Sequence, residues 1–177
     1  MPRLWNKPVM PDPVKQEMEK LRSDYPRPSI FNPLFSGTLL AFDFGTRRIG
    51  IAKGSTLLGS AAPLATIDAE KNEIRFSRIS DLIKEWEPVA LIVGLPCNED
   101  GTPHEMTALS RRFANRLKGR FNLPVMLVDE RYTSAAASSA LDEQGVHGRK
   151  QKTMIDQYAA QQILQAYFDE PTAGIIV

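Results

Sequence analysis

Two runs of consecutive apolar residues set the tightest limit on how this chain can fold: VALIVGLP at 89–96 and LPVMLVDER at 123–131, the second ending in charged residues. A strand that is apolar on both faces must be covered on both sides, which is typical of parallel strands joined through helices. Between the two runs, apolar residues recur at helical spacing over 104–121. This part of the chain therefore predicts two parallel strands connected by a right-handed helical crossover.

Upstream of this unit the pattern predicts antiparallel strands. The run TLLAFDFG at 38–45 predicts a buried strand, and the alternating RIGIAKG at 48–54 predicts its hairpin partner. A third, shorter strand is expected at 58–67, where Pro63 favours an edge or a bend. The segment 73–87 has the apolar spacing of a helix. Together these elements predict an α/β fold: one mixed sheet of three antiparallel strands and two added parallel strands, with helices on both faces.

The last third and the two ends of the chain complete the expected organisation. Two further helices are predicted at 134–144 and 153–170, separated by a basic loop, GVHGRKQK, at 145–152. Seven of the 13 prolines lie in the first 36 residues, which predicts a mostly flexible segment there. The predicted organisation is a proline-rich N-terminal extension at 1–36, one folded domain at 37–170 and a tail at 171–177.

The composition excludes several classes of protein. The 177 residues carry a formal net charge of +1, so attraction to nucleic acid or to an anionic membrane must come from local patches. The single cysteine, Cys97, cannot form an intrachain disulfide, and with only two distant histidines it cannot form a usual zinc site. No apolar run is long enough for a membrane span or for the core of a signal peptide. We expect a cytoplasmic protein without a membrane partner.

Three carboxylates fall where predicted elements begin or end. Asp43 lies in an otherwise apolar strand, Glu130 follows the last parallel strand, and Asp156 lies in the first turn of the final predicted helix. Ligands of such sheets gather at the carboxyl ends of the central strands. Clustered acids raise one another's pKa unless a cation neutralises them, and oxygen ligands without His or Cys suit Mg²⁺ or Mn²⁺. We therefore predict these three acids as metal ligands and as catalytic residues of phosphodiester hydrolysis.

Each acid also has a purely structural explanation. Asp43 can cap the turn DFGT through its own backbone. Glu130 can form a salt bridge with Arg131 or Lys152. Asp156 completes TMID, a variant of the helix capping box, and favours the helix dipole in any case. Only the joint placement of the three acids favours a site over these explanations.

Four segments that contain these acids resemble the signature segments of the YqgF (RuvX) family: AFDFGTRRIGIA, LIVGLPCNEDGT, LVDERYTSAAA and KTMIDQYAAQQIL. The resemblance covers residues 38 to about 169, in the family's order. The family comprises small ribonuclease H-like proteins described as Holliday junction resolvases or pre-16S rRNA nucleases. The resemblance implies a ribonuclease H-like fold and metal-dependent phosphodiester hydrolysis, and it carries the family's acidic triad over to Asp43, Glu130 and Asp156. The family pattern gives the proline-rich extension no role.

Basic and polar residues near the acids predict contacts to nucleic acid, because phosphate contacts need cations close to the chemistry. Two arginines directly follow the first strand, and three cations precede Asp156 in the basic loop. The turn LPCNEDGT adds an asparagine, although a plain connection also explains it. A further cationic segment, RRFANRLKGR at 111–120, is explained by a solvated helix face. The predicted nucleic-acid-binding residues are Arg47, Arg48, Asn98, Arg149, Lys150 and Lys152.

The sequence leaves three functions open. The first is a metal-dependent nuclease, for which the resemblance favours processing of the 16S rRNA precursor in ribosome biogenesis, with Holliday junction resolution as the alternative. The second takes DFGT as the phosphate-binding hairpin of sugar kinases and actin-like ATPases, although the chain has room for only one such domain. The third is a non-catalytic RNA-binding module in ribosome maturation or transcription. We rank the nuclease first, with structured RNA or branched DNA as its partner, acting as a monomer or homodimer.

Overall fold

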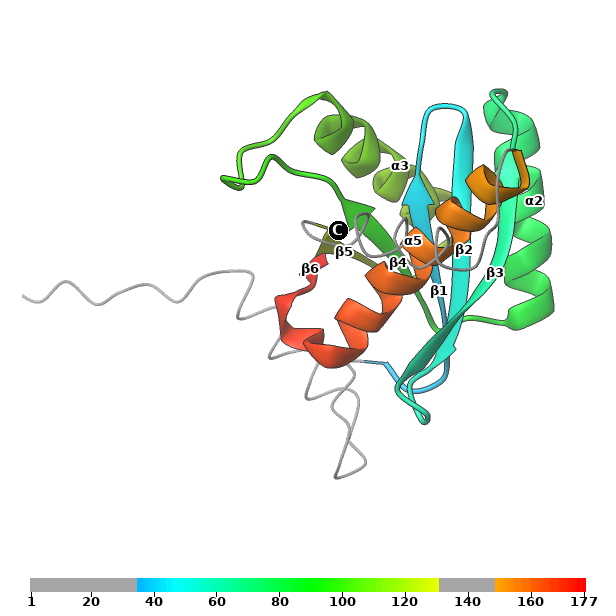
Figure 1. Cartoon of the computed structure of the whole chain (residues 1–177). Helices are drawn as coiled ribbons and strands as arrows, with labels where there is room; N and C mark the ends of the chain where they lie inside the picture. Colours follow the sequence, from blue (N-terminus) through cyan, green and yellow to red (C-terminus); the bar gives the residue numbers. More distant parts are fainter. Residues whose placement is uncertain (1–34, 131–148) are drawn as a thin grey trace, which may run out of the picture.

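The computed structural model describes residues 35–130 and 149–177, which form a single mixed sheet with helices packed on both of its faces (Figure 1). Residues 1–34 and the helix predicted at 134–144 lie outside the described part. None of the described helices has the length and apolar character needed to cross a membrane. The elements are β1 (Thr38–Phe44), β2 (Arg48–Ser55), β3 (Ser60–Asp68), α2 (Asn72–Trp86), β4 (Ala90–Leu95), α3 (Glu105–Phe121), β5 (Val125–Asp129), α5 (Arg149–Asp169), the 3₁₀ turn η1 (Pro171–Ala173) and β6 (Ile175–Ile176).

The strands follow the order β3-β2-β1-β4-β5-β6. β1, β2 and β3 pair antiparallel in sequence, and β4 and β5 are added to β1 in parallel. Pro63 lies on the edge strand β3, opposite Ala52 and next to a register shift in the β2–β3 pairing. This is the ribonuclease H-like arrangement, and it confirms the predicted mixed α/β sheet and the edge position of Pro63.

The predicted count of five strands is one too small. Ile175 and Ile176, within the segment predicted as a tail, form the short strand β6, which pairs antiparallel with Leu127 and Met126 of β5. The pairing occupies backbone groups along the outer edge of β5, an edge that native sheets usually protect. Two residues carry no readable periodicity, and so the sequence pattern does not reveal this strand.

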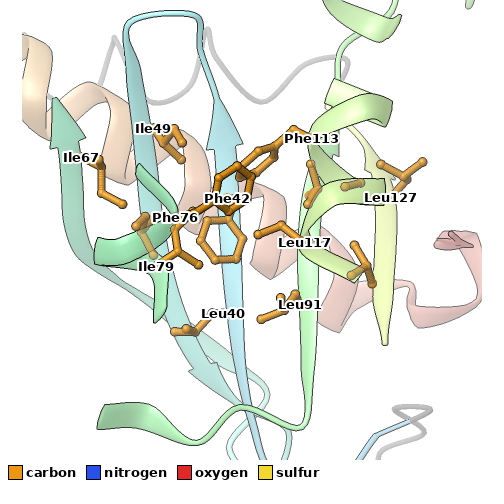
Figure 2. Close-up of a cluster of buried hydrophobic side chains, with 14 of the residues drawn as sticks. Leu40, Phe42, Ile49, Ile67, Phe76, Ile79, Leu91, Phe113, Leu117 and Leu127 are labelled. Carbon is orange, nitrogen blue, oxygen red and sulfur yellow. The ribbon is translucent and has the colours of Figure 1, made fainter. Parts of the chain in front are cut away.

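Side-chain alternation along the strands divides the core between the two faces. On β1, Leu40 and Phe42 belong to the cluster beneath α2 and α3, whereas Leu39 and Ala41 belong to the cluster beneath α5. Figure 2 shows the first cluster, in which Phe42 lies edge-on to Phe113 of α3 with ring centroids 5.9 Å apart. Both faces of the central strands are therefore buried, as their continuous apolar runs predict.

The start of the last helix differs from the expected one. α5 begins at Arg149, four residues before the predicted start, so the second half of the expected basic loop is helical. Arg, Lys and Gln are good helix formers, which is the physical reason for the longer helix. Asp156 consequently lies two turns inside α5, and Thr153, which accepts a hydrogen bond through its carbonyl from Thr66 Oγ1, does not begin the helix. The capping-box explanation of Asp156 is therefore wrong.

Candidate active site

Strand alternation brings Asp43 and Glu130 to the same face of the sheet. On β1, Ala41 packs into the cluster beneath α5, and Asp43 is the next residue on that face. Val128 of β5 packs into the same cluster, so Glu130 follows on the α5 side, whereas Asp129 falls on the opposite side. The backbone N–H of Glu130 still donates to the carbonyl of β4 at Leu95, 3.3 Å away, which ties this residue to the end of the sheet. Of the two neighbouring acids, Glu130 therefore lies on the side of Asp43.

Gly50 allows α5 to bring Asp156 to this edge. Gly50 of β2 lies directly opposite Asp43 in the β1–β2 pairing. A Cβ atom at Gly50 would lie only 1.8 Å from the carbonyl oxygen of Asp156, so the backbone of α5 rests against the bare backbone of β2. A glycine inside a strand often marks such a close approach. Gly50 in the run RIGIAKG is the sequence signal that could have indicated this close approach.

Gly94 has a similar role on β4. A Cβ atom there would lie 2.5 Å from Cδ1 of Ile163 on α5 and 3.2 Å from Oε2 of Glu130. Because Gly94 has no side chain, the side chain of Glu130 fits between the ends of the strands and α5. Two glycines in neighbouring parts of the sheet thus create the space in which acids from β1, β5 and α5 converge.

The three carboxylates share one electrostatic environment. Burial, and then the charge of Asp156, raise the pKa of Asp43 from its usual 3.8 to about 6. Burial, followed by the charges of Asp43 and Asp129, raises the pKa of Glu130 from 4.5 to about 8. Asp43 therefore interacts electrostatically with both of the other predicted ligands.

Arg48 is the cation paired with Asp156. Its Nε donates to Oδ2 of Asp156 at 2.6 Å, and both side chains are partly buried. Among residues 35–130 and 149–177, no group of three or more His, Cys, Asp or Glu side chains is arranged to hold a metal ion. The donor chemistry nevertheless fits a hard divalent cation, because all three predicted ligands offer carboxylate oxygens and two of them are destabilised in their charged form. From the sequence, Arg48 was predicted only as a contact to nucleic acid.

A buried arginine forms hydrogen bonds to the β1–β2 turn, which directly precedes Arg48. Arg75 of α2 is only 3% exposed, and its guanidinium donates to the carbonyl oxygens of Gly45, Thr46 and Ala69. Burial lowers its pKa. The sequence did not reveal this role, because a basic residue in an amphipathic helix normally faces solvent.

The other predicted nucleic-acid-binding residues lie around the same end of the sheet, where the β1–β2 turn and the start of α5 also lie (Figure 1). Arg47 is exposed on that turn, and Lys152 is exposed on α5. Asn98, exposed in the β4–α3 connection, donates through Nδ2 to Oγ1 of Thr102 at 2.9 Å. Arg149 and Lys150 are the first two residues of α5.

The fold and this edge define a class of protein: a ribonuclease H-like α/β domain with converging acids at the carboxyl ends of its central strands. A family model described as RuvX, Holliday junction resolvase, matches residues 37–170, and the chain belongs to this family, as the four sequence segments indicated.

Several relatives carry the name "Putative pre-16S rRNA nuclease". The one from Chromobacterium violaceum is 59% identical over 137 residues, which are 77% of this chain and 100% of the relative. The one from Nitrosomonas eutropha is 49% identical over 165 residues, 93% of this chain and 99% of the relative. Among solved structures, Thermus thermophilus RuvC in complex with a Holliday junction substrate aligns with a TM-score of 0.48 and 14% identity, over 80% of this chain and 99% of that one.

Proposed function

We propose that this protein is a cytoplasmic, metal-dependent nuclease that hydrolyses phosphodiester bonds in the 16S rRNA precursor. The observation that carries the proposal is the convergence of Asp43, Glu130 and Asp156, from three separate elements, on one face of the sheet at its carboxyl edge. The names of the curated relatives support the choice of substrate.

The three acids are the proposed ligands of Mg²⁺ or Mn²⁺, which, when bound, activates a water molecule and stabilises the leaving oxygen. Asp43 is the central ligand, because it interacts electrostatically with both other acids. Arg48 holds the carboxylate of Asp156 at the edge through their 2.6 Å ion pair. Gly50 and Gly94 keep α5 and Glu130 close to the strands.

The cations around this edge are the proposed contacts to the substrate backbone. Arg47 extends from the β1–β2 turn and Lys152 from α5, and both are exposed to an incoming strand. Asn98, Arg149 and Lys150 complete the proposed set. Phosphate contacts of this kind fix the position of a strand without reading its bases.

An Asp43→Asn variant tests the proposal. We expect it to lose at least about 100-fold of the cleavage rate on precursor rRNA in Mg²⁺ or Mn²⁺, because a ligand charge is removed without a change of shape. The matched control is Asp81→Asn, which neutralises an exposed carboxylate on α2 and should cleave like wild type. EDTA should abolish cleavage by wild type. Full activity of Asp43→Asn, or of wild type in excess EDTA, contradicts the proposal.

A second candidate, Holliday junction resolution, follows from the description of the matched family. The same assay includes a four-way DNA junction beside the RNA, and the molecular mass in solution shows whether two sites act together. Faster cleavage of the junction by a dimer would assign the chain to resolution. RNA binding without cleavage of either substrate would indicate the non-catalytic module.

A further inference from the structure

A pocket of about 290 Å³ lies on the opposite face of the sheet from α5. It is bounded by the end of β1, the β1–β2 turn, the start of α2 and the middle of α3. Phe44 and Phe113, stacked with their ring centroids 4.7 Å apart, form its apolar part. Its polar lining consists of Thr46, Glu70, Asn72, Arg75, Arg112 and Arg116.

The lining of this pocket is cationic. Arg112 and Arg116 lie one helical turn apart on the same face of α3 and are exposed, and neither forms an ion pair with any residue that the structure describes. Arg75 directs its hydrogen bonds to backbone carbonyls but still carries its positive charge, which the single acid, Glu70, offsets. One further turn along α3, Arg120 lies over the ring of Phe76, 4.4 Å from its centroid. Arg120 and Phe76 line a second pocket between the same two helices, together with Glu73. We define the α2–α3 groove by Arg112, Arg116 and Arg120.

The α2–α3 groove opens at the end of the sheet where Asp43, Glu130 and Asp156 lie, which we call the acidic edge. Thr46 lines the pocket and directly precedes Arg47 and Arg48. Asp43 lies three residues before Thr46, which is about 10 Å of extended chain. α3 follows β4 and therefore also begins at this end. A strand held at the acidic edge can reach the groove by crossing the β1–β2 turn.

We propose that the α2–α3 groove binds the sugar-phosphate backbone of the nucleic acid substrate, a few nucleotides from the bond cut at the acidic edge. This inference rests on the proposed nuclease function. Exposed arginines that form no ion pair with any described residue are suited to the phosphates of a single strand. The groove gives a function to the cationic segment 111–120, which a solvated helix face otherwise explains.

The test compares two double variants that remove the same charge. Arg112→Gln with Arg116→Gln removes the groove cations, and Arg78→Gln with Arg111→Gln removes two exposed arginines of the same helices that do not line the pocket. Binding of the full chain to single-stranded RNAs of about 5 and about 20 nucleotides is measured in EDTA at several salt concentrations. Two lost phosphate contacts reduce the slope of log Kd against log salt by about 1.4 for a single strand.

We expect this reduction, with several-fold weaker binding, only for the groove variant and only for the longer RNA. Arg112→Lys with Arg116→Lys, which keeps the charge, should retain most of the wild-type slope. If the double glutamine variant does not fold, the single variants Arg112→Gln and Arg116→Gln should each reduce the slope by about 0.7. Equal slopes for the groove and control variants would overturn the inference. Cleavage by wild type in Mg²⁺ separates the two proposals: if the slopes differ but no substrate is cut, the groove stands and the nuclease function fails.

Discussion

Gly50 determines the geometry of the acidic edge although it has no side chain. It lies opposite Asp43, and the carbonyl of Asp156 occupies the position where its Cβ would be. Gly50 carries a hydrogen atom where any other residue carries Cβ, and α5 can therefore lie close to β2. The separation of the proposed ligands Asp43 and Asp156 depends on this close packing.

Gly50→Ala should therefore reduce activity far more than an ordinary surface change. The new Cβ, 1.8 Å from the Asp156 carbonyl oxygen, pushes α5 away from β2. We expect a destabilisation of about 1–3 kcal/mol from overpacking and a loss of at least about 100-fold in cleavage rate for the fraction that remains folded. Gly119→Ala on α3, where a Cβ would meet nothing within 4 Å, is the control and should leave both quantities close to wild type. Wild-type cleavage by Gly50→Ala would refute this role.

At the residue scale, the sequence could predict which acids matter but not how they are held. Asp43 and Glu130 could be proposed because one lies within an apolar strand and the other follows one, and alternation within β5 explains why Glu130 rather than Asp129 lies on the α5 face. The pairing of Arg48 with Asp156 could not be predicted, because it joins residues 108 positions apart through the packing of α5.

At the scale of elements, α2 supports the β1–β2 hairpin from the opposite face. Arg75 is the point of contact, since it donates to two carbonyls of the turn and to one that precedes α2. The hairpin itself was predictable from its alternating run and its turn residues. The contact between Arg75 and the turn was not predictable, because a helical pattern does not show which cation points into the protein.

Arg75→Met should loosen this hairpin. Several carbonyls lose their donor, and we expect a loss of about 2–4 kcal/mol in the free energy of unfolding, measured by chemical denaturation. Amide hydrogen exchange should accelerate in the β1–β2 turn. Arg78→Met, an exposed position on the same helix, should change the free energy of unfolding by less than about 0.5 kcal/mol. Unchanged exchange in the turn of the Arg75 variant would show that this contact is dispensable.

At the scale of the whole molecule, the acidic edge lowers the free energy of unfolding in the absence of metal. The folded-state pKa values of Asp43, about 6, and Glu130, about 8, lie above their usual values of 3.8 and 4.5. The folded protein therefore binds protons more tightly than the unfolded chain, and these groups reduce stability as the pH rises from about 4 to about 8.

Glu130→Gln should remove most of this pH dependence. In EDTA at pH 8 we expect the variant to melt several degrees above wild type, because each unit of pKa shift corresponds to about 1.4 kcal/mol and 1 kcal/mol shifts the Tm of a chain this size by roughly 2–4 °C. At pH 4 the two should melt together. The exposed Glu99→Gln serves as the control and should follow wild type at both pH values. A variant less stable than wild type at pH 8 would contradict the raised pKa.

The position of α5 more than 100 residues after β1 has a consequence for protein synthesis. Asp43 leaves the ribosome with β1, well before Asp156, which emerges with α5 and reaches Asp43 only when that helix packs against Gly50. A growing chain therefore exposes an unfinished acidic edge. If the protein cuts ribosomal RNA as proposed, its acidic edge is incomplete beside the RNA of the ribosome that makes it until α5 has emerged and packed against β2.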